Sequence, residues 1–257
     1  MKIILRIRQI FNFKTLIVCI LSIISTLLCQ KYGINANFPM TIVGIAVVFP
    51  LVFSIDGAYK RREIALQHYS SLKAHGRALY LASRDWTTDN SKENIMQSKA
   101  LLLTLLKSFS ILFKSGLNEQ DDNERKVYTH FSALSKHINQ FRERGVASGE
   151  VSRCNQYLSK MIDAFENMKH IFQYRTPRTL RTYSNIFIFL IPIVYGPFFV
   201  YIAGSFNLLI LLTMPVILSI VLTSLDNIQK QLENPFDQIV EDDIHINEDK
   251  FVDLLEM

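Results

Sequence analysis

The chain has 257 residues, a formal net charge of +5 and a mean hydropathy of +0.17. Apolar residues make up 49% and charged residues only 20%, which excludes a disordered chain. Three cysteines without a CxxC pair exclude a disulfide scaffold. The charge is unevenly distributed, because Thr15–Gln30, Tyr32–Ile55 and Thr182–Leu225 contain none. The composition therefore indicates an integral membrane protein with a substantial aqueous part.

Four membrane-spanning helices are predicted, because a span needs about 20 mostly apolar residues. Thr15–Gln30 gives the first span and Phe38–Ile55 the second. The long uncharged stretch near the C-terminus is broken at Gly204–Asn207, so it gives two spans, at Ser184–Ala203 and Leu208–Leu225. The first span has an alternative interpretation as a signal peptide, although no small-x-small cleavage site stands close behind it.

The distribution of lysine and arginine predicts the orientation of these spans. The loop between the first two spans carries only Lys31, and the turn between the last two carries no basic residue. Both termini and the large middle segment are therefore expected in the cytoplasm, with the chain in the inner (plasma) membrane. The basic residues at the expected cytoplasmic ends are Lys2, Arg6, Arg8, Lys14, Lys60, Arg61, Arg62, Arg175, Arg178, Arg181 and Lys230.

The segment between the second and third spans is predicted to be helical. Lys60–Ser83 continues the second span, and apolar residues at helical spacing predict helices at Ser91–Lys114, Glu124–Arg144 and Ser148–Phe172. Pro177 ends this region. The predicted fold class is all-α, and the predicted organisation is 1–59 for an N-terminal segment with spans 1 and 2, 60–181 for a helical cytoplasmic region, 182–225 for spans 3 and 4, and 226–257 for a cytoplasmic C-terminal tail.

The sequence carries no motif of a known catalytic or nucleotide-binding site: no Gly-rich phosphate loop, HExxH, GxSxG or CxxC. His68 and His75 share a helix face, as do His130 and His137, but a metal site needs closer spacing or carboxylate support. These histidines are interpreted as surface or interface residues. We therefore expect no enzyme activity, no bound metal and no nucleic-acid partner.

Two segments next to predicted spans carry recognisable motifs. Phe53–Arg62, at the end of span 2, contains a Phe-x5-Tyr-x-Arg pattern formed by Phe53, Tyr59 and Arg61. The segment after span 4 ends in four consecutive motif residues, Glu233, Asn234, Pro235 and Phe236. These motifs, their positions and the four-span layout resemble the bestrophin family of pentameric ion channels.

The chain departs from the family pattern at two places. Arg62 and Glu63 stand where bacterial and plant members usually have tryptophans, and Thr176-Pro177 stands in place of an Ile-Pro pair ahead of span 3. The chain thus resembles a divergent, bacterial member. The resemblance implies four transmembrane helices per subunit with a helical cytoplasmic region, arranged as a homopentamer around a central pore.

The resemblance also implies a function for one face of span 2. Ile45, Phe49 and Phe53 are four residues apart and drift by only about 40° per step, so they share a helix face. By itself such a stripe is typical of helix packing. In the family the matching positions form a hydrophobic neck, in which apolar rings resist wetting and act as a gate to ions. Pro50 and Gly44 lie beside these positions and would bend or loosen the helix.

A second constriction is implied at the cytoplasmic aperture, where Thr176 matches the family's isoleucine. Arg175 and Arg178 flank it. They would favour anions if they face the pore, and would follow the positive-inside rule if they face lipid headgroups. Since the family includes both anion and cation channels, the sequence leaves chloride or other anions and monovalent cations open.

Calcium is the one cofactor that the resemblance raises. Gln231 and Asn234 stand where two ligands of a calcium clasp in animal members would stand. The acidic cluster Glu241, Asp242 and Asp243 comes later than that pattern requires, and a Ca²⁺ site needs six to eight oxygen ligands. We interpret the cluster as part of an acidic solvated tail and expect no cofactor.

The leading interpretation is therefore a homopentameric channel whose partners are further copies of the chain, inorganic ions and the lipid bilayer. The alternative is a non-conducting, membrane-anchored helical interaction protein, since the cytoplasmic segment is long enough to bind partners. A secondary transporter would normally need more spans and an inverted repeat, which the sequence does not show.

Overall fold

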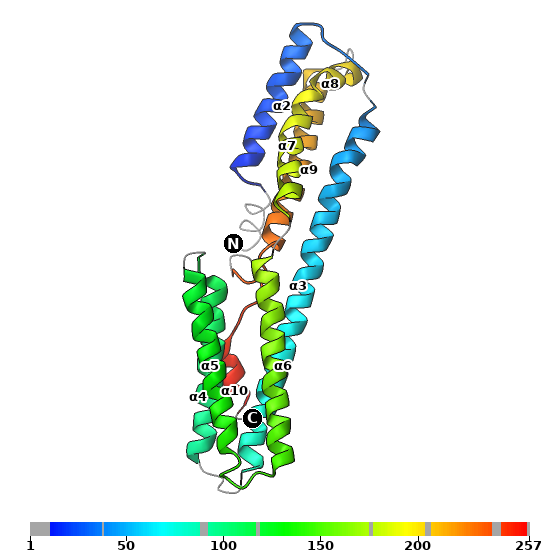
Figure 1. The fold of residues 1–257 in the computed structure, drawn as a ribbon. Coiled ribbons are helices and arrows are strands. Elements are labelled where there is room, and N and C mark those ends of the chain that lie inside the picture. The colour runs from blue at the N-terminus through cyan, green and yellow to red at the C-terminus, as the bar shows by residue number, and fades with distance from the viewer. Residues whose placement is uncertain are drawn as a thin grey trace. The chain divides into compact units, whose positions relative to one another are not determined.

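The computed structural model describes residues 11–37, 39–87, 92–116, 119–174, 177–203, 207–237 and 243–255, and over these residues it is helical without strands. The chain divides into two compact units (Figure 1). The membrane unit comprises residues 1–60 and 176–233, and the bundle unit comprises residues 61–175 and 234–257. The long helix α3 (Met40–Asp85) contributes to both.

The membrane unit contains the start of α3 and the helices α2 (Phe13–Lys31), α7 (Arg178–Val194), α8 (Gly196–Ala203) and α9 (Leu208–Leu232). Asn12 forms a capping box with Thr15 at the start of α2, which satisfies amide groups that have no partner within the helix. Helix α2 packs against α7, α8 and α9 (Figure 1). The buried apolar residues of this unit are Val47, Leu51, Ile188, Ile191, Tyr195, Phe198, Phe199 and Leu222.

The third predicted span is bent by 40° rather than straight, because α7 and α8 meet at a break around Tyr195. Pro197 has no N–H to donate to the carbonyl of Ile193, four residues earlier. Ser25 of α2 donates its hydroxyl to that carbonyl instead, at 2.6 Å. Such substitution by a neighbouring helix is how membrane helices tolerate proline. Gly196 permits this close approach, since a Cβ there would lie 2.6 Å from Ser25 Oγ.

Three described helices are long and apolar enough to cross a membrane, and the bent α7–α8 pair adds a fourth candidate. Helices α2 and α9 and the bent pair coincide with the predicted first, fourth and third spans. The start of α3 is not among the candidates, because its described side chains run from Gly44 into Asp56, Lys60 and Arg61. We assign the second span there from the uncharged sequence that ends at Ile55.

The remaining candidate is α4 (Lys92–Lys114), which we assign to the helical region outside the membrane. In its most apolar stretch 44% of the residues are buried, against 22% in α2 and 28% in α9. Leu105, Phe109 and Leu112 are buried within the core of the bundle unit. The apolar composition of α4 therefore supplies a protein core, whereas α2 and α9 leave their apolar side chains exposed to lipid.

The bundle unit is built from the rest of α3 with α4, α5 (Gln120–Gln140), α6 (Ser148–Gln173) and α10 (Glu248–Asp253). Helix α5 packs against both α4 and α6 (Figure 1). Their facing sides meet through stacked aromatic rings, with Phe109 and Phe165 at a centroid distance of 4.9 Å. These helices begin and end within a few residues of the predicted ones, because their apolar residues recur at helical spacing.

The C-terminal segment is a structural part of the bundle unit. Phe236 stacks on Phe113 at 4.4 Å, and the amide of Ile244 donates to the carbonyl of Pro235 at 2.7 Å. The residues that this segment adds to the core are Phe236, Ile244, Ile246, Phe251, Val252 and Leu255. The interpretation of this segment as a solvated tail is therefore wrong for residues 243–255, where apolar side chains outweigh the effect of the neighbouring acids.

Candidate functional site

The face of α3 that carries Ile45, Phe49 and Phe53 is exposed within the subunit. These side chains are 58%, 59% and 60% exposed. Val47 and Leu51, on the opposite side of the helix, are buried. The rotation of α3 thus directs one apolar side into the core of the membrane unit and leaves the other side exposed among the described residues. Ile45, Phe49 and Phe53 lie on one side of the helix, as their spacing in the sequence predicts.

The exposed face is aromatic and continuous. The rings of Phe49 and Phe53 meet edge to face, with centroids 4.7 Å apart at an interplanar angle of 86°. In this geometry the positive edge of one ring meets the negative face of the other. Val52 adds to the same surface at 49% exposure. Gly44 has open space beside its Cα, so packing within the subunit does not require glycine there.

Pro50 interrupts the hydrogen bonds of α3 in the middle of this face. A proline has no N–H, so the carbonyl of Ala46, four residues earlier, loses its helical partner. The hydroxyl of Tyr183 on α7 donates to that carbonyl at 3.0 Å. The position of Pro50 indicates that the Ala46 carbonyl needs a donor, but the sequence does not identify Tyr183. This tyrosine therefore joins the candidate site only through the structure.

An ion pair follows the apolar face along α3. Asp56 and Lys60 are one turn apart and their charged atoms are 2.7 Å from each other, with both side chains at least half exposed. Exposed pairs of this kind add little stability, because water screens them. Tyr59 of the sequence motif is 52% exposed, and Arg61 is partly buried. The pair presents both signs of charge, so it adds no net charge to this part of the face.

The second motif forms the end of the membrane unit and the entry to the bundle unit. Glu233 is 5% exposed and forms an ion pair with Arg181 at the start of α7. Asn234 accepts the amide of Phe236 at 3.4 Å, as in an Asx turn, with Pro235 between them. The role of these residues in the structure is therefore to end α9 and to direct Phe236 into the aromatic core.

The residues that the resemblance gives to a calcium clasp have other interactions or lie outside the described part of the chain. The side-chain oxygen of Asn234 accepts the amide of Phe236, and Gln231 and Asp243 have interactions elsewhere in the protein. Glu241 and Asp242 lie outside the described residues. Within the described part of the chain, no three His, Cys, Asp or Glu side chains converge as metal ligands. No chemical step is assigned to calcium.

The predicted cytoplasmic aperture lies outside the part of the chain that the structure describes. Arg175 and Thr176 precede the described residues that begin at Pro177. Helix α7 begins at Arg178, whose side chain is likewise outside the description. The aperture therefore stays a prediction.

A charged cluster ties three helices of the membrane unit together. Lys14 on α2 donates to Asp226 on α9 at 2.7 Å and to Asn185 on α7 at 2.8 Å. Lys230 reaches the same carboxylate oxygen at 2.7 Å. Asp226 is 1% exposed, so both lysines are needed to compensate the cost of burying its charge. The sequence analysis missed this cluster, although Asp226 is the first charge after the long uncharged stretch.

The fold of this chain is similar to that of solved bacterial proteins. No family model and no curated protein matches the chain. A bacterial bestrophin homologue from Klebsiella pneumoniae is 17% identical, with a TM-score of 0.71 and 95% of each chain covered. A single-residue mutant of that homologue has 15% identity and a TM-score of 0.75, covering 95% of this chain and 94% of its own. The chain therefore has the fold of bacterial bestrophin homologues, which confirms the recognised resemblance and the all-helical fold of a membrane protein.

Proposed function

We propose that the chain is one subunit of a homopentameric, bestrophin-like ion channel, and that the exposed face of α3 lines its neck. The observation that carries the proposal is the exposure of Ile45, Phe49 and Phe53 in a chain with this fold. Five such faces around an axis would form three stacked apolar rings. A narrow apolar constriction resists wetting, so it holds ions back until the rings move apart.

Lipid contact is the competing explanation for an exposed apolar face in a membrane protein. Helix α2 provides the comparison, because Leu16, Ile20 and Ile24 are also exposed. Helix α2 packs against α7, α8 and α9, and the side that faces away from them is exposed. The start of α3, in contrast, combines an exposed aromatic pair with a proline whose free carbonyl is held from α7. Proline is a common site of helix bending, so we propose that α3 changes its curvature at Pro50 when the rings move apart.

The substrate we propose is a small monovalent ion. The described part of the face carries the balanced Asp56–Lys60 pair, which selects neither sign. Chloride or another anion would be favoured if Arg175 and Arg178 face the pore; monovalent cations would be conducted if they face lipid headgroups. We place the channel in the plasma membrane with both termini in the cytoplasm, because lysine and arginine gather at those ends.

Purified protein in planar bilayers tests the proposal directly. Wild-type protein should give discrete currents, and Phe49→Ala or Phe53→Ala should raise the leak or change gating by removing one aromatic ring per subunit. Ile24→Ala is the matched control, since it removes a comparably exposed apolar side chain from α2 and should leave the currents unchanged. Reversal potentials in asymmetric KCl and NaCl then give the sign of the permeant ion.

Two results would contradict the channel. Silent bilayers across voltages and salts, with intact oligomers, would favour the non-conducting interaction protein instead. A monomer or dimer mass in mild detergent would do the same, because the neck needs several α3 faces around one axis.

A further inference from the structure

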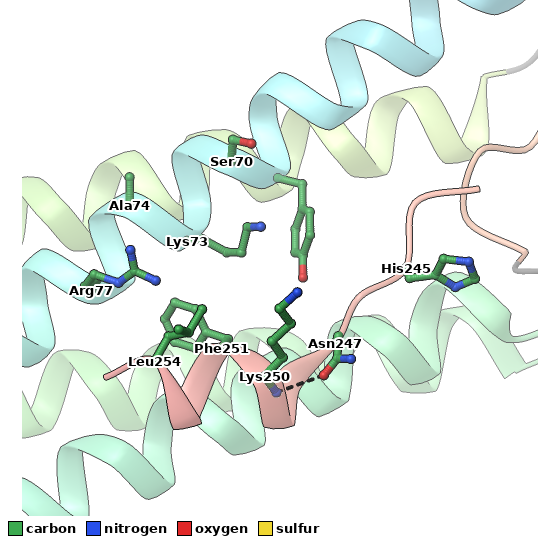
Figure 2. Close-up of a pocket in the computed structure, with 10 residues that line it drawn as sticks. Ser70, Lys73, Ala74, Arg77, His245, Asn247, Lys250, Phe251 and Leu254 are labelled. Atoms are coloured by element: carbon green, nitrogen blue, oxygen red, sulfur yellow. Dashed lines mark hydrogen bonds between the residues drawn. The ribbon is translucent and has the colours of Figure 1, made fainter. Parts of the chain in front are cut away.

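We propose that the pocket between α3 and the C-terminal segment of the bundle unit binds a phosphate-bearing anion. The pocket has a volume of about 510 Å³ and lies wholly within the bundle unit (Figure 2). Its basic residues are Lys73 and Arg77 on α3, Lys250 on α10, and His245 just before α10. The amino group of Lys73 lies over the ring of Tyr69, 4.4 Å from its centroid, and the side chain of Lys250 extends into the pocket from α10 (Figure 2).

Among the described residues, no carboxylate forms an ion pair with the lysines and the arginine of this pocket, and Lys73 contacts the ring of Tyr69. In the described part of the chain, Lys73, Arg77 and Lys250 form no ion pair, whereas Lys60, Arg84 and Lys169 do. Burial, reinforced by the charges of Arg77 and Lys250, lowers the pKa of Lys73. A partly buried cation beside two further, exposed cations is a setting that an anionic ligand would stabilise.

Acidic groups near the pocket belong to α10. The pKa of the Tyr69 hydroxyl is raised mainly by burial and also by the negative charge of Glu248. Glu248 forms no ion pair with Lys73 or Arg77 in the described structure. A bound anion would therefore lie closest to the cationic side chains of α3 and Lys250.

The chemistry of the lining favours phosphate over a halide ion. Arginine offers a planar fork of N–H donors that matches two phosphate oxygens, and lysine binds phosphate as a point charge. Ser70 and Asn247 add polar groups, and Leu254 gives an apolar wall. The volume falls in the range of small-molecule sites, about 300–1,000 Å³, and is much larger than one chloride ion needs. A multiply charged phosphate compound meets these conditions.

Binding would connect two parts of the bundle unit that are distant in sequence. Lys73 and Arg77 belong to α3, and Lys250 belongs to α10 at the end of the described chain. An anion that contacts both would hold the C-terminal segment against α3. Bound ligand should therefore slow proteolysis and amide exchange in residues 243–255.

The experiment uses the full chain in detergent and does not depend on ion conduction. Tripolyphosphate is the soluble probe, and vesicles containing phosphatidic acid are the lipid probe. Isothermal titration should show tripolyphosphate binding that weakens with salt, together with slower amide exchange in the C-terminal segment. Binding to the vesicles alone would instead assign the pocket to lipid headgroups.

Lys73→Gln, Arg77→Gln and Lys250→Gln should each weaken tripolyphosphate binding by about tenfold or more, as for loss of a charged hydrogen bond. Lys160→Gln, an exposed lysine on α6 outside the pocket, is the control and should bind as wild type. Gel filtration checks that each variant remains folded. A variant that combines all three pocket substitutions should show the largest loss of affinity. Unchanged tripolyphosphate binding in this combined variant, or an equal loss of affinity in Lys160→Gln, would overturn the proposal whether or not the protein conducts ions.

Discussion

The hydrogen bond from Tyr183 to the Ala46 carbonyl gives the sharpest test of how α3 is built. Tyr183→Phe removes a hydroxyl that donates to this carbonyl, where Pro50 has no N–H to offer. Hydrogen bonds between membrane helices contribute about 0.6 kcal/mol on average and about 1.7 kcal/mol at most. We expect Tyr183→Phe to lower the free energy of unfolding within that range.

A double-mutant cycle separates this hydrogen bond from other effects of the tyrosine. In Pro50→Ala the new N–H of residue 50 can donate to the Ala46 carbonyl, so the hydroxyl of Tyr183 becomes redundant. Tyr183→Phe should then cost little in the Pro50→Ala background. Tyr201→Phe, on α8, is the matched control and should leave stability unchanged in both backgrounds.

The assay is equilibrium unfolding of the purified protein in mixed micelles, followed by the loss of helix signal. The coupling energy should equal most of the single-mutant cost of Tyr183→Phe. The same cost for Tyr183→Phe in the presence and absence of Pro50 would refute the assignment, because the hydroxyl would then not compensate for the proline. Bilayer currents from the same variants would show whether this bond also affects gating.

Three further predictions concern the two units separately. Asp226→Asn should destabilise the membrane unit by about 3 kcal/mol, because it leaves the partly buried Lys14 without its countercharge, and unfolding in mixed micelles measures this. Phe236→Ala should lower the free energy of unfolding by about 3–5 kcal/mol, because it removes the buried ring that stacks on Phe113. Phe236→Leu should recover much of that loss, and thermal unfolding of both variants measures the difference. His137 is buried with its pKa lowered by burial, so the folded protein holds it neutral while the unfolded chain protonates it near pH 6.5. Stability should therefore fall as the pH drops below about 6.5, and His137→Gln should flatten this part of a Tm profile between pH 5 and 8; an unchanged slope would contradict it.

The helices of the bundle unit and the shared face of Ile45, Phe49 and Phe53 could be predicted from sequence because both depend on periodicity, whereas the exposure of that face could not. Ile45, Phe49 and Phe53 share a face in any straight or gently bent helix, whatever surrounds it. Leu105, Phe109 and Leu112 mark a buried side of α4 in the same way. Local spacing carries this information, so no knowledge of neighbouring helices is needed.

The parts that escaped prediction depend on contacts between segments distant in sequence. Pro50 shows that the Ala46 carbonyl lacks a partner, but Tyr183 lies on a helix whose position the sequence does not give. The bend at Tyr195 could be predicted in principle, because the Gly196-Pro197 pair breaks a helix within an apolar stretch. The hydrogen bond from Ser25 to the Ile193 carbonyl, which replaces the one lost at Pro197, could not be predicted from the sequence.

The C-terminal segment shows how a charged stretch can conceal core residues. Acidic residues at 241–243 suggest solvation, and the apolar residues after them are too few for a recognisable helix of ordinary length. Ile244 and Ile246 alternate as in an extended chain, and Phe251, Val252 and Leu255 follow with helical spacing. The change of period within so short a segment weakens both patterns. Only the apolar surface of the bundle unit determines that these side chains are buried.

Helix α3 combines structural and proposed functional requirements that usually conflict. A helix packed on all sides would be more stable, yet α3 leaves its aromatic face exposed in the membrane unit, and its cations Lys73 and Arg77 form no ion pair with a described residue of the bundle unit. Each departure costs free energy that the fold alone does not require. Further copies of the chain would compensate the first, and a phosphate-bearing anion the second. The two proposals therefore make separate claims about one helix, and either can fail without affecting the other.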